Sequence, residues 1–226
     1  MIKVEKIETW GFEHAIRGMR NPMNSWNKSD SKYVWDECDG KFDACEWVDI
    51  DFKVGPNDLG LMRKLYKAGT EHRTYARMIQ CSMDIVAPLY WWKEMDRYTV
   101  GKSQVSCSTM HKIAAKEFEL DDFSHEHLLD TGMWLLETMI DRLNKWRSVY
   151  VLGNQVYEPK NKEIWWQMIQ LLPSSYNQKR TICMSYETVF KIIKERTGHK
   201  LTEWEDFVAL LRRLPYVEEI IDGSET

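Results

Sequence analysis

Residues 85–112 of the sequence read IVAPLYWWKEMDRYTVGKSQVSCSTMHK, and their order decides how the fold is interpreted. An apolar, strand-like run comes first, and Pro88 then suits the first turn of a helix that we expect over residues 89–98. A loop rich in Ser and Gly is expected over residues 99–109, where Gly101 allows a positive φ. Hydroxyl and N–H groups in such a loop can bind an anion. The stretch therefore predicts a strand, a helix and an anion-binding loop in succession.

The length and composition are those of an ordinary globular protein. The chain has 226 residues, of which 43% are hydrophobic and 29% are charged, and we predict a single domain over residues 1–226. The formal net charge of −4 argues against a general nucleic-acid binder, which needs a basic surface. The 11 Trp residues favour a core with an oligomer interface, or else a pocket for a flat ligand.

Cysteine and hydropathy patterns bear on location and on metals. The 5 cysteines are odd in number and belong to a chain that is not small, so we expect reduced thiols and a cytoplasmic protein. Cys38 and Cys45 lack the two closely spaced pairs of a zinc site, and no metal site is predicted. No apolar run approaches the ~18 residues of a membrane span, so no membrane partner is expected.

Periodicity predicts both strands and helices. Alternating apolar and polar residues predict strands over residues 2–10 and 78–86. In the second strand four side chains are expected to face inward: Ile79, Cys81, Met83 and Ile85. Helical spacing predicts helices over residues 57–68, 124–150, 160–172 and 175–196, and a last helix that begins at Thr202. This mixture indicates an α+β protein rather than an all-helical one.

Two further segments are expected to stand apart from these elements. A β-hairpin insertion is predicted over residues 27–54, with residues 32–38 paired to residues 42–50 around the turn signal Asp39-Gly40. The acidic tail after Pro215 is predicted to be frayed.

The stretch over residues 85–112 resembles the signature region of the flavin-dependent thymidylate synthases. That family has a strand, a proline, a helix that ends in Arg-His-Arg, and a serine at fixed spacing beyond it. Here Asp96-Arg97-Tyr98 fills the Arg-His-Arg slot, Ser106 falls on the signature serine, and Gln104 stands where the family usually has Glu. Since two of the three basic residues are replaced, the resemblance is to a diverged member.

Weaker similarities to the same family lie nearer the two ends of the chain. Residues 11–26 are turn-rich, and Arg17 and Ser25 loosely resemble the element where flavin contacts begin in the family. Arginines in such a segment also suit a solvated loop. At the family's spacing from Pro173, Arg196 lands on an arginine that holds the nucleotide.

The resemblance implies a fold, an activity and a set of binding residues. The fold would be α+β, a twisted and mostly antiparallel sheet flanked by long helices, in a homotetramer with active sites built from several subunits. The activity would be reductive methylation of dUMP or a related pyrimidine nucleotide, with methylenetetrahydrofolate as carbon donor and reduced FAD as hydride donor. The residues implied for FAD are Arg17, Ser25, Arg97, Lys102 and Ser103. Those implied for the nucleotide are Gln104, Ser106, Arg180 and Arg196.

The altered signature leaves two other interpretations open. One is a non-catalytic nucleotide-binding or assembly protein on the same scaffold, since an aspartate in place of an arginine repels a phosphate. The other is an unrelated helical protein whose similarity to the signature is chance. The strand predicted over residues 78–86 discriminates, because an all-helical structure would exclude the family fold.

Overall fold

The computed structural model of the chain describes residues 2–35 and 50–223. Its strands are β1 (Lys3–Trp10), β2 (Lys32–Trp35), β3 (Ile50–Lys53), β4 (Gln80–Pro88), β5 (Lys102–Ser106) and β6 (Asn177–Ser185). Its helices are α1 (Phe12–Arg20), α2 (Pro56–Lys67), α3 (Leu89–Met95), α4 (Thr109–Lys112), α5 (Asp130–Leu152), α6 (Lys162–Leu171), α7 (Tyr186–Arg196), α8 (Thr202–Arg212) and α9 (Val217–Ile221). Helices and antiparallel strands occur together, so the predicted α+β class is confirmed.

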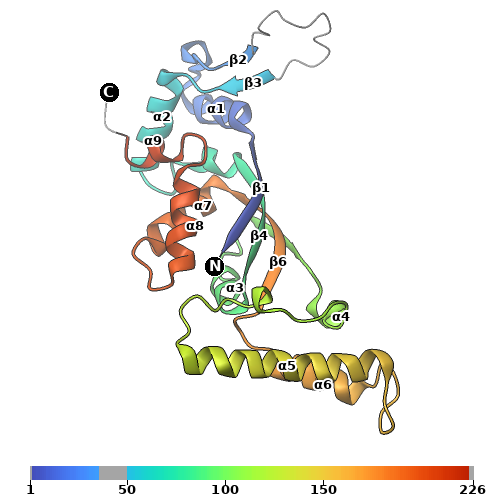
Figure 1. Cartoon of the computed structure of the whole chain (residues 1–226). Coiled ribbons are helices and arrows are strands. Elements are labelled where there is room, and N and C mark those ends of the chain that lie inside the picture. Colours follow the sequence, from blue (N-terminus) through green and yellow to red (C-terminus); the bar gives the residue numbers. More distant parts are fainter. Residues whose placement is uncertain (1, 36–49, 224–226) are drawn as a thin grey trace, which may run out of the picture.

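A sheet with the strand order β1-β4-β6-β5 organises the described part of the chain (Figure 1). Every neighbouring pair in it is antiparallel, and β4 pairs with β6 along its full length. Alternate side chains of β4 are buried on one face: Cys81, Met83, Ile85 and Ala87. The strand predicted over residues 78–86 is therefore confirmed together with its inward-facing residues, although it begins at Gln80.

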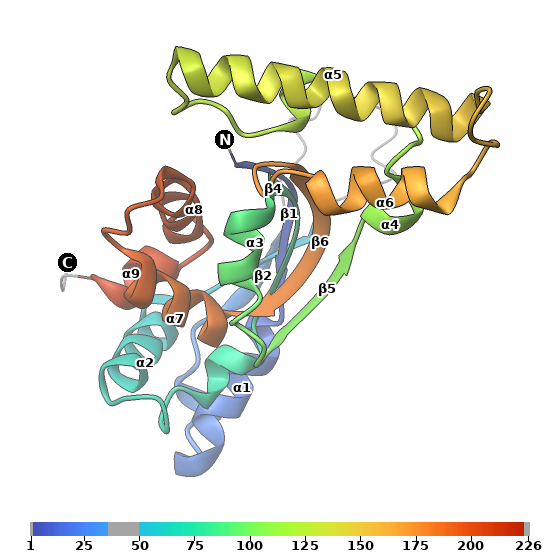
Figure 2. The same cartoon turned by 90° about the horizontal axis from the view of Figure 1, so that it is seen from below.

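Helices α3, α7 and α8 cover one face of this sheet, and none of the described helices covers the other (Figures 1 and 2). The covered side is rich in tryptophan. Trp91 of α3 and Trp204 of α8 are fully buried, with ring centroids 4.7 Å apart, and Phe207 packs edge-on against Trp91. Part of the high tryptophan content therefore serves the core, as the composition suggested.

Helices α5 and α6 lie side by side across one end of the sheet (Figures 1 and 2). They form a second, smaller core in which Leu136 and Leu143 of α5 meet Met168 of α6. The helix predicted over residues 160–172 is confirmed. The helix predicted over residues 124–150 is confirmed only from Asp130 onward.

The residues before α5 are tied to another part of the chain instead of starting the helix. The N–H of Ser124 donates to the carbonyl of Ser175 at 2.8 Å, and Phe123 forms an antiparallel bridge with Tyr176. These long-range bonds satisfy backbone groups that a helix would otherwise use. The early start of the predicted helix is wrong for this reason.

The helix predicted over residues 175–196 is wrong in its first half, because residues 177–185 form β6. Alternate side chains explain the strand: Ile182 and Met184 are buried on the core face, whereas Thr181, just before Ile182, bonds to Asp84 on the other face. Hydrogen bonding to β4 on one edge and β5 on the other outweighs the helical spacing that the apolar residues also show.

Two segments predicted as loops are regular. Residues 102–106 form the edge strand β5 within the loop predicted over residues 99–109. The turn-rich segment predicted over residues 11–26 begins with helix α1. Helix α1 forms because its apolar side chains recur at helical spacing and are buried: Phe12, Ala15, Ile16 and Met19.

Strands β2 and β3 pair antiparallel, with Trp35 opposite Ile50 in the backbone register. The predicted hairpin pairs residues 32–38 with residues 42–50, so the observed second strand begins where the predicted one ends. The turn expected at Asp39-Gly40 lies outside the described residues. The single domain and its hairpin insertion stay predictions.

The frayed tail predicted after Pro215 is wrong for the residues that form α9. Val217 and Ile220 are buried and belong to the main core, so the tail packs for the same hydrophobic reason as the other helices.

Candidate ligand-binding site

Strands β5 and β6 place four predicted site residues on one face of the sheet. Because side chains alternate along a strand, Lys102, Gln104 and Ser106 of β5 share a face, and Ser103 points to the opposite one. Arg180 of β6 lies opposite Ser106 in the register and therefore on the same face as Ser106. The two strands that the sequence did not predict are what bring these residues together.

These side chains converge on the carboxylate of Asp96, the residue that ends helix α3. Its Oδ1 atom accepts a hydrogen bond from Gln104 Nε2 at 2.8 Å and another from Arg180 Nη1 at 2.8 Å. The ammonium nitrogen of Lys102 lies 3.9 Å from the same oxygen. We call Asp96, Lys102, Gln104 and Arg180 the Asp96 cluster.

Arg180 is held in a fixed orientation by its surroundings. Its guanidinium carbon lies 4.3 Å from the centroid of the Trp92 ring, within the range of a cation–π contact. Its Nε donates to Gln178 Oε1 at 2.9 Å. Gln178 Nε2 in turn donates to the carbonyl of Cys107 and to Thr109 Oγ1, which ties the loop after β5 to the cluster.

Lys102 supplies positive charge from a nearly buried position. Its Nζ donates to the carbonyl of Met95 at 2.9 Å and to Gln104 Oε1 at 3.1 Å. The first bond gives a hydrogen-bond donor to a backbone carbonyl at the C-terminal end of helix α3. Burial lowers the pKa of Lys102 because it disfavours the charged ammonium; the Asp96 carboxylate opposes this effect, and Arg180 adds to it.

Arg196, which the resemblance assigns to the nucleotide, lies in a different cluster. Its Nε donates to Tyr98 Oη at 2.9 Å, its Nη1 pairs with Glu94, and its guanidinium carbon lies 4.5 Å from the Trp204 ring centroid. Burial raises the pKa of Tyr98, and the Arg196 hydrogen bond opposes this rise. The tyrosine in the signature slot thus binds an arginine from α7 instead of providing a cation itself.

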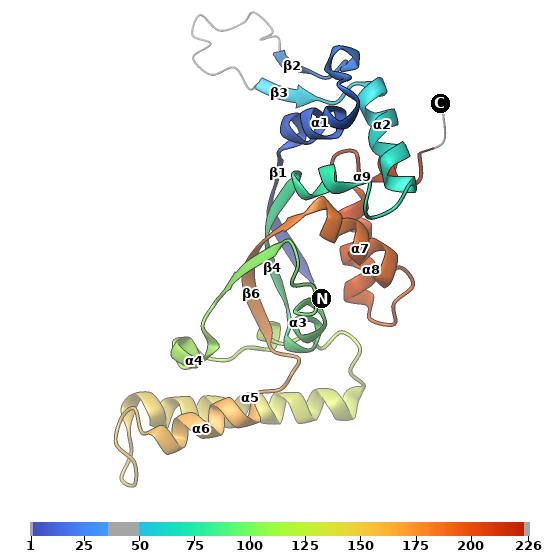
Figure 3. The same cartoon turned by 180° about the vertical axis from the view of Figure 1, so that it is seen from behind.

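The other predicted FAD residues are not gathered around the Asp96 cluster. Arg97 is exposed just beyond α3, and Ser103 faces the opposite side of the sheet. Arg17 is exposed on α1, and Ser25 follows in the turn after that helix. Helix α1 lies at the end of the sheet where β5 begins, and α4 lies at the end where β5 finishes (Figures 1 and 3).

Sequence reasoning missed Trp92 and Gln178 as parts of this site, and did not see Asp96 as its centre. The alternation of Gln178, Arg180, Ile182 and Met184 has the period of a strand and is the signal that would have placed Gln178 beside Arg180. No local pattern predicts the stack of Trp92 on Arg180, because it depends on how α3 packs against β6.

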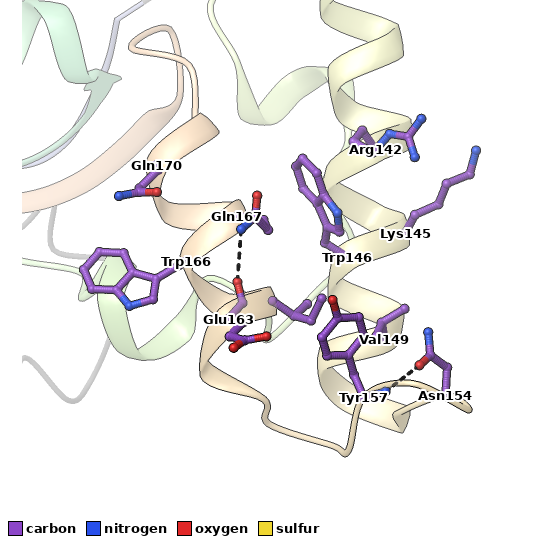
Figure 4. A pocket seen from close by; sticks show the side chains of 11 residues that line it. Arg142, Lys145, Trp146, Val149, Asn154, Tyr157, Glu163, Trp166, Gln167 and Gln170 are labelled. Carbon is purple, nitrogen blue, oxygen red and sulfur yellow. Dashed lines mark hydrogen bonds between the residues drawn. The ribbon is translucent and has the colours of Figure 1, made fainter.

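A cavity of about 780 Å³ lies between α5 and α6 (Figure 4). Trp146 of α5 points toward α6, whereas Lys145 points outward and pairs with Asp141 at 2.6 Å. None of the predicted binding residues lines this cavity.

The described residues contain no group of three or more His, Cys, Asp or Glu side chains that could hold a metal ion. In the same ranges, 2–35 and 50–223, no helix has the length and apolar character needed to cross a membrane.

Comparison of the sequence with protein-family models and with curated proteins finds no match. Comparison of the structure does. Thymidylate synthase X (ThyX) from Helicobacter pylori, solved with FAD and dUMP, superposes with a TM-score of 0.64 at 15% identity, covering 98% of this chain and 100% of that one. A second structure of the flavin-dependent enzyme from the same organism, also with FAD and dUMP, gives a TM-score of 0.63 at 16% identity, covering 96% and 100%.

The chain has the ThyX fold. A UMP/dUMP methylase, PolB from Streptomyces cacaoi bound with 5-Br UMP, is also similar, with a TM-score of 0.59 at 11% identity over 97% of this chain and 93% of that one. The predicted resemblance to flavin-dependent thymidylate synthases is therefore confirmed for the fold, at the low identity of a diverged member.

Proposed function

We propose that this protein is a ThyX-like enzyme that methylates a pyrimidine nucleotide, dUMP or a close relative, with FAD as cofactor and methylenetetrahydrofolate as carbon donor. The observation that carries the proposal is the whole-chain similarity to ThyX structures that hold FAD and dUMP. The similarity to a UMP/dUMP methylase supports nucleotide methylation as the common chemistry.

The residues on the ligand-facing side of β5 and β6 fit a phosphate group. Arg180 offers a guanidinium, Gln104 an amide and Ser106 a hydroxyl on one face, and Lys102 adds positive charge beneath them. An oriented guanidinium suits the oxygens of a phosphate better than a lysine does. A phosphate is also the group that dUMP and FAD have in common. We assign Gln104, Ser106 and Arg180 to the nucleotide, with Arg196 as a further candidate.

We propose that the cofactor site is built from residues of more than one subunit. Arg17 is exposed on α1 and Arg97 is exposed just beyond α3, and we propose that Arg17 and Ser25 approach the other assigned FAD residues across an interface of a homotetramer. Reduced FAD would supply the hydride there, and the protein residues would bind and orient the ligands. Exposed apolar side chains on α5 support such an interface.

A cytoplasmic location is part of the proposal. Cys81, Cys107 and Cys183 are free thiols in the structure, and free thiols are typical of a reducing compartment.

A non-catalytic nucleotide-binding or assembly protein is the second candidate. The observation that favours it is the pairing of both candidate phosphate-binding arginines with carboxylates of the same chain, Arg180 with Asp96 and Arg196 with Glu94. A charge that is already neutralised attracts a phosphate less strongly.

An absorbance spectrum tests the proposal first. The purified protein is incubated with FAD and passed through gel filtration, and the flavin band in the protein peak is compared with that of the Arg180→Gln variant. Wild-type protein is then assayed by mass spectrometry for dTMP formed from dUMP, methylenetetrahydrofolate and a reductant. Bound flavin and dTMP formation support the enzyme. Stabilisation by dUMP without flavin binding favours a nucleotide-binding protein, and binding of neither ligand contradicts both the enzyme and the nucleotide-binding protein and leaves the assembly role.

A further inference from the structure

The Asp96 cluster has the geometry of an anion-binding site whose anion is supplied by the chain itself. One oxygen, Asp96 Oδ1, collects hydrogen bonds from Arg180 and Gln104 at 2.8 Å each and is approached by Lys102 at 3.9 Å. Charge-assisted hydrogen bonds of this kind are the contacts that proteins use to bind carboxylate and phosphate ligands.

The cations of the cluster are fixed, whereas the carboxylate lies at its edge. The side chains of Lys102 and Arg180 are 4% and 12% exposed, and that of Asp96 is 44% exposed. Lys102 is held from behind by the carbonyl of Met95, and Arg180 by Gln178 and the Trp92 ring. If the carboxylate leaves, the donors therefore keep their positions.

The position of Asp96 in the chain allows it to leave. It caps the end of α3 and takes no part in the β5–β6 ladder, so rotation of its side chain breaks no backbone hydrogen bond of the sheet. Its own N–H stays bonded within the last turn of α3. The movement required is one side-chain rotation into solvent.

We infer that Asp96 is an internal anion that occupies a phosphate-binding site formed by Arg180, Gln104 and Ser106, and that a phosphorylated ligand binds there by displacing it. The inference rests on the proposed function in one respect, since it treats this face of β5 and β6 as a ligand site. A phosphate brings more charge and more acceptor oxygens than one carboxylate, so it competes for the same donors. Asp96 thereby sets how strongly the site binds phosphate.

Titration with inorganic pyrophosphate tests this directly. Asp96→Asn keeps the size of the side chain and an acceptor oxygen but removes the competing charge. We expect this variant to bind pyrophosphate about tenfold or more tightly than the wild type in low salt, by isothermal titration calorimetry. Asp141→Asn is the matched control, because Asp141 also pairs with a cation, Lys145, but on the exposed surface of α5. The control is expected to bind as the wild type does.

The double variant Asp96→Asn/Arg180→Gln tests whether the gain comes through this site. We expect it to bind no more tightly than the wild type. Equal affinity of wild type and Asp96→Asn overturns the inference, as does a gain that survives the loss of Arg180. If the Asp96→Asn protein does not fold, the titration is repeated with Asp96→Ala.

Pyrophosphate is neither the proposed substrate nor the proposed cofactor, so the two ideas fail separately. If the wild-type protein binds neither FAD nor dUMP, the proposed function is rejected. The pyrophosphate titrations still decide whether Asp96 competes for the site. Repeating the titration of Asp96→Asn with dUMP and with FAD distinguishes the source of the phosphate: a tenfold gain for either supports the inference and identifies the ligand that carries it.

Discussion

The guanidinium of Arg180 stacks on the indole of Trp92, with its central carbon 4.3 Å from the ring centroid. Trp92 is fully buried and donates its Nε1 hydrogen to the carbonyl of Gln178, so the ring that supports Arg180 is itself locked to β6. The stack is therefore a rigid part of the site, and it determines the direction in which Arg180 offers its hydrogen bonds.

Replacing Arg180 by Lys tests how much that stack contributes. A lysine keeps the charge, but it cannot bond to both Asp96 and Gln178 in one plane and stacks less well. We expect the free energy of unfolding to fall by about 1–2 kcal/mol, measured by urea denaturation. Lys179→Arg is the control, because Lys179 is the neighbouring residue on the other face of the strand and pairs with Asp84 near the surface. Equal effects of the two substitutions would contradict the prediction.

Gly101 precedes β5 with a φ of +68°, a conformation that residues with a side chain rarely adopt. A Cβ atom there would lie 2.7 Å from Ser185 Oγ and 3.1 Å from Thr188 Oγ1. Gly101→Ala is therefore expected to lower the free energy of unfolding by about 1–3 kcal/mol and to weaken ligand binding by displacing Lys102 and Gln104.

Gly60 provides the matched control for this substitution. It lies inside helix α2, and a Cβ atom there has no neighbour within 4 Å. Gly60→Ala is expected to stabilise the protein by about 0.5–1 kcal/mol, because alanine loses less backbone entropy in a helix. The pair is compared by thermal and urea unfolding; a loss of stability at Gly60 as large as that at Gly101 would count against the role of the positive φ.

Helix α5 presents large apolar side chains to solvent near its start. Trp134 is 66% exposed and Leu135 is 59% exposed, and neighbouring large apolar side chains with such exposure are unusual in a monomeric protein. If this surface forms part of the proposed homotetramer, Leu135→Glu is expected to reduce the assembly to smaller species, measured by light scattering after gel filtration. Glu137→Gln, at an exposed position two residues further along the same helix, should leave the assembly unchanged. A wild-type monomer, or an assembly indifferent to Leu135→Glu, would reject this interface.

The central strand β4 and helix α6 could be predicted from the sequence, because they follow from local patterns. The alternation of Cys81, Met83 and Ile85 has one explanation, a half-buried strand. The apolar residues around Ile182 fitted two periods at once, and only pairing with β4 and β5 decided between them. Local spacing cannot contain that information, since the partner strands lie 70 or more residues away.

For the candidate site, the sequence named several residues that lie together in the structure but did not indicate how they are arranged. Lys102 and Gln104 belong to the signature stretch, Arg180 was named as an additional cation for the nucleotide, and the structure places the three together. That Asp96 bonds to Arg180, and Glu94 to Arg196, depends on how α3 packs against the sheet and α7. The consequence is that both arginines are neutralised in the structure, which no motif indicates.

Asp58 is a fully buried carboxylate at the start of α2, and it joins the N-terminal region to that helix. Its oxygens accept hydrogen bonds from Arg20 Nε at 2.6 Å, Ser29 Oγ at 2.7 Å and Ser31 Oγ at 2.6 Å. Burial by itself raises the pKa of Asp58, but the hydrogen bonds from Ser31, Ser29 and Arg20 together hold the pKa below its ordinary value.

The sign of the resulting pH dependence follows from that direction. Because the pKa of Asp58 is lower in the folded protein than in the unfolded chain, its contribution to stability is fully present above about pH 4 and is lost as the pH falls through the folded value. We expect Asp58→Asn to lower the free energy of unfolding by about 3–5 kcal/mol at pH 7, since it leaves the Arg20 charge buried without its partner.

Urea unfolding between pH 7 and pH 3 should show a shallower loss of stability in the variant than in the wild type. Asp141→Asn, in an exposed pair, should shift stability by less than about 1 kcal/mol and keep the wild-type slope. An acid slope in Asp58→Asn as steep as that of the wild type would show that other carboxylates govern the acid sensitivity of the fold.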